Sequence, residues 1–117
     1  MTDADRDVAR NLLALARGGT AIIVRAATDD ELRGFDPSLV CHDNARRWVE
    51  LHPTHRIVRG YIASTGWLLD QHSVVDTGTA LLDITPRVAR RRLPFIPHPG
   101  TEDEFWRLPA QLLAATP

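Results

Sequence analysis

Apolar residues recur at helical spacing near the N-terminus. Between positions 4 and 17, valine or leucine occupies positions 8, 12, 13 and 15, acidic residues come first, and two glycines follow where a helix C-cap belongs. This pattern predicts an amphipathic helix over Ala4–Arg17. Because the segment opens with acids and alternates charged with apolar residues, it is unlike a signal peptide, and we expect an ordinary first helix.

A second helix is predicted over the segment CHDNARRWVEL. Ser38 stands where an N-cap residue would start it, and Pro53 disfavours α geometry in the residue before it, so the helix should end by His52. Cys41 therefore lies in the first turn of a helix. Backbone N–H groups there lack intrahelical acceptors and the helix dipole is positive, which stabilises an anion such as a thiolate.

Several short segments have the composition of strands, namely Thr20–Arg25, Arg56–Ala63, His72–Asp76 and Ala80–Thr85. The last two flank Asp-Thr-Gly-Thr, a hairpin-turn signal, so we expect them to be antiparallel neighbours. Beyond Pro86 the chain is rich in proline and arginine, and a short helix is predicted around Thr101–Arg107. We interpret this end as a tail packed over the sheet.

Together these elements predict an α+β fold, in which the N-terminal helix and the Cys41-bearing helix pack on a small antiparallel sheet. A chain of 117 residues with 44% hydrophobic and 25% charged residues matches an ordinary globular protein, so we expect a single domain over residues 1–117. Its apolar stretches are far shorter than the run of about 18 residues that spans a bilayer. A net charge of -1 provides no field that attracts nucleic acid. We therefore expect neither a membrane nor a nucleic acid as partner.

The inventory of reactive side chains is narrow. All 14 basic residues are arginine, which excludes a lysine-based mechanism within the chain. The single cysteine, Cys41, cannot form an internal disulfide. We expect the reducing cytoplasm as the compartment of this chain.

The predicted hairpin places a histidine opposite a carboxylate. Counting outward from Gly78, His72 lies six residues before the glycine and Asp83 five residues after it, so the two should face each other within one register step. A carboxylate that binds one ring nitrogen keeps the histidine in one tautomer. The other nitrogen can then take a proton from a thiol.

Three short motifs carry a resemblance to known families. CHDNARRW, WLLDQHSVVDTGTALLDIT and LPFIP are similar to small uncharacterised bacterial papain-like proteins with a Cys-His-x-Asn motif, a His-bearing strand and an Asp-x-Thr-Pro strand end. They resemble more loosely the protein N-terminal glutamine amidohydrolases, in which an Asp-x-Asp-Thr segment leads into Leu-Pro-Phe-Pro. This chain is shorter than those enzymes, and its Asp83-Ile-Thr85 segment lacks their second acid. Their substrate specificity therefore does not carry over.

The resemblance implies a papain-like or transglutaminase-like fold with a catalytic triad. By similarity, Cys41 is the nucleophile, His72 the base and Asp83 the acid that orients the base. Such an enzyme acts on an amide of a protein or peptide, as a deamidase, amidohydrolase or peptidase, or transfers the acyl group to an amine. It needs no cofactor.

Further residues are expected to support that chemistry. The oxyanion of an acyl transfer needs two hydrogen-bond donors. One would be the N–H of Cys41 or His42, and the other would come from the loop before Cys41 or from Gln71. Asn44 is expected to support the start of the helix. Trp48 and Trp67 are expected to form walls of the cleft.

Alternative interpretations stay open for the same residues. A solitary cysteine is often a small buried hydrophobe, and tryptophans are often core residues. His42 would complete a zinc set with the triad residues, but no Cys-x-x-Cys or His-Glu-x-x-His spacing supports it, so we expect no metal. The arginines of 87–92 form either an anion site or a solvated face that balances acidic segments.

The alternative to an enzyme is a non-catalytic protein-binding module of the same fold. A binding module would tolerate loss of the Cys41 thiol, whereas a thiol enzyme would not. A homodimer that completes the cleft is compatible with the sequence.

Overall fold

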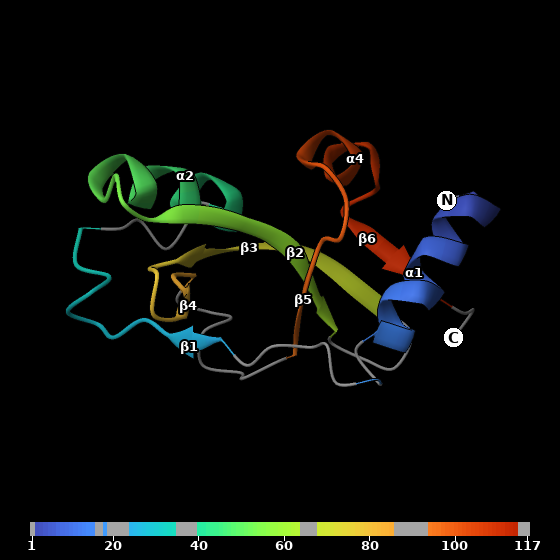
Figure 1. Cartoon of the computed structure of the whole chain (residues 1–117), viewed down its shortest axis with the longest axis horizontal. Helices are drawn as coiled ribbons and strands as arrows, with labels where there is room; N and C mark the ends of the chain where they lie inside the picture. Colours follow the sequence, from blue (N-terminus) through green and yellow to red (C-terminus); the bar gives the residue numbers. More distant parts are fainter. Residues whose placement is uncertain are drawn as a thin grey trace. The chain divides into compact units, whose positions relative to one another are not determined.

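The computed structural model describes residues 2–15, 18, 24–34, 40–63, 68–85 and 94–114. These residues form an α+β fold, as the sequence predicts. No helix among them is long and apolar enough to cross a membrane. In chain order, the elements in Figure 1 are α1 (Asp3–Leu15), β1 (Arg25–Ala26), α2 (Cys41–Leu51), β2 (Arg56–Ala63), β3 (Leu68–Asp76), β4 (Leu81–Asp83), β5 (Phe95–Pro97), α4 (Glu102–Arg107) and β6 (Gln111–Leu113).

The chain divides into two compact units. The first unit comprises Met1–Ile22, Arg59–Gln71 and Leu93–Pro117, and the second comprises Ile23–Val58 and His72–Arg92. Strand β2 begins in the second unit and ends in the first, while β3 runs the other way. Each unit has its own hydrophobic cluster. The single domain expected over residues 1–117 stays a prediction.

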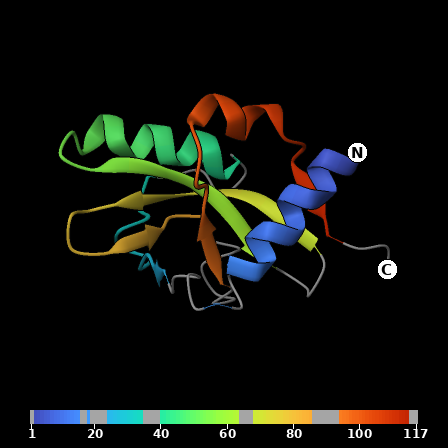
Figure 2. The same cartoon turned by 45° about the vertical axis from the view of Figure 1, so that its right-hand side comes forward.

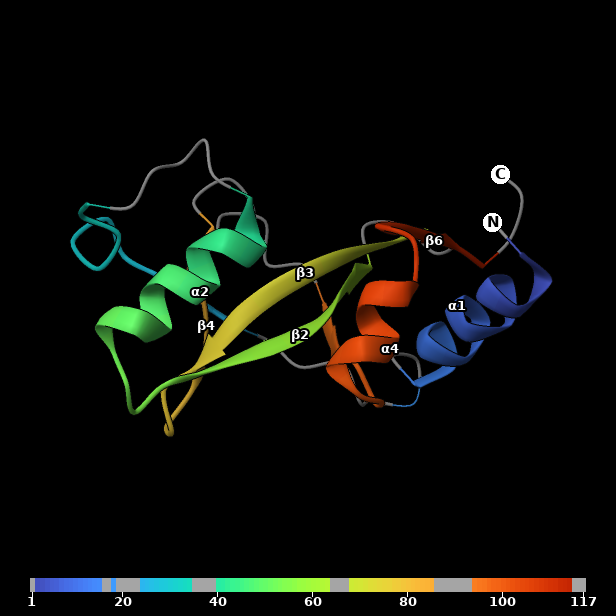
Figure 3. The same ribbon diagram turned by 90° about the horizontal axis from the view of Figure 1, so that it is seen from above.

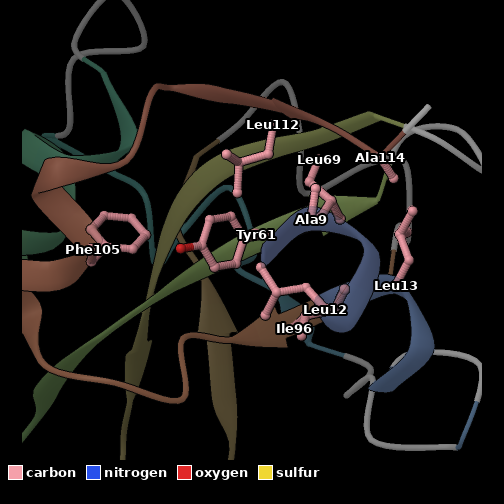
Figure 4. Packing of buried hydrophobic residues seen from close by; sticks show 9 residues of the cluster. All are labelled: Ala9, Leu12, Leu13, Tyr61, Leu69, Ile96, Phe105, Leu112 and Ala114. Carbon is pink, nitrogen blue, oxygen red and sulfur yellow. The ribbon is translucent and has the colours of Figure 1, made fainter. Parts of the chain in front are cut away.

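In the first unit, β5 pairs with β2 and β6 pairs with β3. Both pairs are antiparallel, with Tyr61 opposite Ile96 and Leu69 opposite Leu112. Helix α1 lies beside β6 in all three views (Figures 1, 2 and 3). The elements enclose one hydrophobic cluster, shown in Figure 4, which consists of Ala9, Leu12, Leu13, Tyr61, Leu69, Ile96, Phe105, Leu112 and Ala114.

Tyr61 is the large polar side chain of this cluster. It is fully buried, its ring contacts the ring of Phe105, and its hydroxyl oxygen lies 2.9 Å from Nδ1 of His98. Burial raises the pKa of Tyr61 and lowers the pKa of His98. Both groups are therefore neutral at neutral pH, and a hydrogen bond joins the hydroxyl to the imidazole.

In the second unit, helix α2 packs on the hairpin formed by the end of β3 and β4. Val75 lies opposite Leu82 in this antiparallel pair, and β1 runs parallel to β4 on its other edge. The sheet of this unit is therefore mixed, whereas the sequence predicts an antiparallel one. Its hydrophobic cluster consists of Ala45, Trp48, Val75, Leu82 and Ile84.

Figure 2 shows the tight turn that joins β3 to β4, at the Asp-Thr-Gly-Thr segment that the sequence predicts as a hairpin turn. Gly78 has a φ of 94°, in the left-handed region that favours glycine. Its N–H donates to a carboxylate oxygen of Asp76 at 2.8 Å, and Thr77 N–H bonds to the carbonyl of Ala80 at 3.0 Å. The predicted hairpin is confirmed.

Several element boundaries differ from expectation. The first helix and β2 are confirmed, but β3 begins at Leu68 rather than His72, and β4 is only three residues long. The C-terminal region is more than a tail, because it adds β5 and β6 around the predicted helix. Those strands are three residues each, and one ends in Pro97, a residue type that disfavours strands. Most of Thr20–Arg25 and all of residues 86–93 lie outside the described residues.

Strand β5 lies so close to β2 at Gly60 that only a glycine fits there. We therefore expect Gly60→Ala to destabilise the protein by about 1–3 kcal/mol through overpacking. A Cβ there would overlap the carbonyl oxygen of Ile96 and lie 2.5 Å from Cζ of Phe95. Urea denaturation measures the loss. Gly18→Ala is the matched control, because its Cβ would meet no atom within 4 Å. Equal stabilities of the two variants would contradict this explanation.

Acid should lower the free energy of unfolding through His98, the hydrogen-bond partner of Tyr61. Because burial lowers the pKa of His98 in the folded protein, the unfolded chain binds the proton more readily, and stability is lost as the pH falls below about 6.5. Urea denaturation between pH 7.5 and 5.5 should show a steeper loss in the wild type than in His98→Gln, which keeps a hydrogen-bonding side chain for Tyr61. Parallel pH profiles would show that His98 does not contribute.

Candidate active site

Cys41 is the first residue of helix α2. The position before it, Val40, has extended backbone angles and no side-chain cap, so the predicted start at Ser38 is wrong. Ser38 itself lies outside the described residues. The hydrogen-bond ladder begins when the N–H groups of Asp43 and Asn44 both donate to the carbonyl of Val40. The N–H of Cys41 precedes that ladder, and its half-buried side chain lies at the positive end of the helix dipole, as predicted.

His72 on β3 and Asp83 on β4 form a buried hydrogen bond. His72 Nε2 lies 3.0 Å from Asp83 Oδ2, and both residues are at least 97% buried. The register places Asp83 opposite Val74, so His72 is a diagonal neighbour two residues away on the same face. The expected offset of one residue is wrong, because it would have placed the two side chains on opposite faces.

The backbone around Asp83 fixes its carboxylate. Its second oxygen, Oδ1, accepts the N–H of Thr85 at 3.0 Å, and its carbonyl accepts the N–H of Ala27 at 2.9 Å. The carboxylate therefore has one oxygen held by the chain and the other directed at His72.

Two imidazole rings contact the Cys41 thiol. Nδ1 of His42 lies 3.8 Å from Sγ, and His72 also forms a hydrogen bond with the thiol. Burial raises the pKa of Cys41, but the two histidines outweigh burial and lower this pKa to about 6. Burial likewise lowers the pKa of His72, but Asp83 and Cys41 raise it to about 9.

These two pKa values define the charge state of the pair. Because the thiol ionises at about 6 and the imidazole loses its proton at about 9, the pair is a thiolate and an imidazolium at neutral pH. A thiolate is the nucleophilic form of cysteine, and an imidazolium can protonate a leaving group. Since Asp83 holds Nε2 of His72, Nδ1 is the nitrogen left for the thiol.

The other expected site residues have different environments. Asn44 is fully buried in the first turn of α2. Gln71 belongs to the first unit, where its side-chain amide donates to the carbonyls of Phe105 at 2.7 Å and Leu108 at 3.4 Å. Trp67 lies outside the described residues.

Trp48 belongs to the hydrophobic cluster of the second unit and is 96% buried. Its Nε1–H donates to Nδ1 of His55 at 3.0 Å, and its ring stacks on that of His52. The expectation that Trp48 walls an open cleft is therefore corrected. His52 and His55 are both half-buried beside it.

Ser73 is a site residue that the sequence analysis missed. It is fully buried on β3, and its Oγ lies 2.6 Å from Nδ1 of His42. Its position directly after His72 was the available signal, but a serine in a strand has many ordinary roles.

The structure also bears on the metal alternative. No three histidine, cysteine or acidic residues among the described positions are grouped so as to hold a metal ion.

A surface hollow lies elsewhere on α2, and Cys41 does not line it. Its lining residues are Asp43, Arg46, Arg47, Glu50 and Leu51.

A comparison of the chain with protein-family models, with curated proteins and with solved structures finds no match. The chemistry of the site is therefore inferred from its own geometry.

The reactivity of Cys41 provides a direct test of the ion pair. We expect alkylation by iodoacetamide to follow an apparent pKa of about 6 in the native protein, and about 8.5 in urea-unfolded protein. In His72→Ala this pKa should rise by about one unit or more, because the thiolate loses one of its two histidine partners. Identical profiles in native and unfolded protein would contradict the ion pair.

Proposed function

We propose that this chain is a cysteine-dependent enzyme that acts on an amide of a protein or peptide, with a papain-like or transglutaminase-like arrangement of its catalytic groups. The observation that carries the proposal is the continuous series of contacts from Cys41 to His72 to Asp83, drawn from the start of a helix and two adjacent strands. Cys41 and His72 have the charge states that nucleophilic catalysis requires.

The mechanism starts from the thiolate of Cys41. It attacks the amide carbonyl carbon, and the carbonyl oxygen becomes an oxyanion beside the start of α2, where the Cys41 N–H is a candidate donor. The imidazolium of His72 then gives its proton to the departing nitrogen, which leaves as ammonia or an amine. The remaining thioester is an acyl-enzyme.

The second half of the reaction restores the thiolate. Neutral His72 removes a proton from water, or from an acceptor amine, which attacks the thioester and expels the Cys41 sulfur. Water gives hydrolysis, and an amine gives acyl transfer. Asp83 keeps Nε2 of His72 bound in both halves, so the same ring nitrogen, Nδ1, moves the proton each time.

The burial of the site supports the proposal of a macromolecular substrate. His72 and Asp83 are almost fully buried, and only Cys41 is partly accessible. An extended peptide segment or a protruding carboxamide side chain would bring its amide to the accessible part of Cys41. We therefore propose glutamine or asparagine side chains and peptide bonds as the amides to test first.

The test is a screen for release of ammonia or of new amines from peptides. The peptides carry internal glutamine, N-terminal glutamine or asparagine, and each is assayed with and without an added amine acceptor. We expect kcat/KM to rise as the thiol ionises near pH 6 and to fall as His72 loses its proton near pH 9. Cys41→Ala should abolish turnover, and His72→Ala should reduce it by about 10²–10⁴-fold.

Asp83→Asn tests the orienting acid. It should lower the activity and move the upper pH limb below 9, because His72 loses the carboxylate that raises its pKa. Asp103→Asn makes the same chemical change on an exposed part of α4 and is the matched control. A folded protein with no turnover on any of these amides, or with turnover unchanged in Cys41→Ala, would sink the enzyme proposal and favour a binding module.

A further inference from the structure

The Cys41 thiol has one more histidine than a triad requires. His72 is bound to a carboxylate, whereas His42 is bound to a neutral hydroxyl, that of Ser73. The two rings therefore differ in what holds them. Asp83 supplies negative charge that favours a protonated His72, while Ser73 can orient the His42 ring without supplying charge.

The contact between His42 and Ser73 also joins two elements. His42 is the second residue of α2, and Ser73 is fully buried on β3. At 2.6 Å the pair is as close as a strong hydrogen bond allows. A side chain in the first turn of a helix can adopt several rotamers, so a partner fixed in the strand limits which way the ring faces. The ring orientation that results places Nδ1 3.8 Å from Sγ.

We propose that Ser73 is a positioning residue, which holds the His42 ring so that its Nδ1–H stabilises the Cys41 thiolate while His72 alone exchanges the proton. This inference deepens the proposed function and rests on it for its role in catalysis. The Nδ1 proton of His42 is shared between Ser73 Oγ and Sγ. When the thiol becomes an anion, the sulfur takes the larger share, because a charged acceptor forms the stronger hydrogen bond.

The assignment explains why the pKa of Cys41 is low although the thiol is half-buried. Burial alone raises the pKa, and the hydrogen bond from His42 is the largest single interaction that lowers it, followed by that from His72. The groups that act on the thiol from α2 and β3 are these two histidines. Removing the hydroxyl of Ser73 should let the His42 ring turn away and weaken its contribution.

The experiment is a double-mutant cycle on the pH profile of Cys41 alkylation by iodoacetamide. We expect Ser73→Ala to raise the apparent thiol pKa by about one unit, which lowers the alkylation rate at pH 6.5 about threefold. His42→Ala should raise the pKa further. In the His42→Ala background, Ser73→Ala should have no additional effect, because the serine acts through the histidine.

A further variant and a folding control keep the inference falsifiable if the serine position is sensitive to packing. Ser73→Thr retains a hydroxyl and should restore the low pKa, and far-UV circular dichroism confirms that each variant is folded. An unchanged profile in Ser73→Ala, or a shift of the same size in both backgrounds, would overturn the assignment. A shift that persists without His42 would instead show that Ser73 acts on the strand and on His72.

The alkylation profile needs no amide substrate, so its failure is distinct from failure of the proposed function. If peptides are turned over but the cycle shows no coupling, only the role of Ser73 is wrong. If the coupling is present but no amide is turned over, the thiolate is stabilised as inferred and the proposed reaction is wrong.

Discussion

The hydrogen bond between His72 and Asp83 is the interaction on which the rest of the candidate site depends. Both side chains are almost entirely removed from solvent, so neither would be stable at its position without the other. The bond selects one ring nitrogen of His72 for the carboxylate and leaves the other for the thiol. It also keeps the imidazole protonated at pH values where a histidine in water would be neutral. The charge on Cys41 is in turn stabilised by that cation.

Most of the support for Asp83 comes from the backbone. The antiparallel pairing of β3 and β4 sets its distance from His72, the parallel strand β1 reaches its carbonyl, and the following residue binds its second oxygen. Cys41 is fixed differently, because Ala45 and Trp48 anchor α2 in the same hydrophobic cluster that contains Val75 and Leu82. A helix and a hairpin that share one small core can therefore hold reactive groups in a constant geometry. All of these residues belong to the second unit.

Local patterns were sufficient to predict much of this unit. The proline after His52 and the polar–apolar pattern defined α2, and the Asp-Thr-Gly-Thr turn defined the hairpin that brings His72 to Asp83. The sequence could not show which residues pair across the two strands. A direct pair and a diagonal pair two residues apart both place the two side chains on the same face of the sheet, so the alternation of side chains is the same in both cases. Nor could the sequence show Ser73 beside His42, because that contact depends on how α2 lies on β3. The strands β5 and β6 were missed because strands of three residues are stabilised by their partners rather than by their own composition.

The tight turn at Gly78 has a consequence for how this protein can change over evolution. Side chains alternate between the two faces of a strand. The number of residues from His72 to Asp83 therefore determines whether the two side chains lie on the same face. One residue added to the turn, or removed from it, would shift the pairing of β4 and carry the carboxylate to the wrong face. Substitutions in this loop are compatible with the site where glycine keeps its left-handed backbone, whereas a one-residue shift of the pairing is not. The length of this surface turn is therefore tied to the buried site, although surface turns are usually the most freely varied part of a fold.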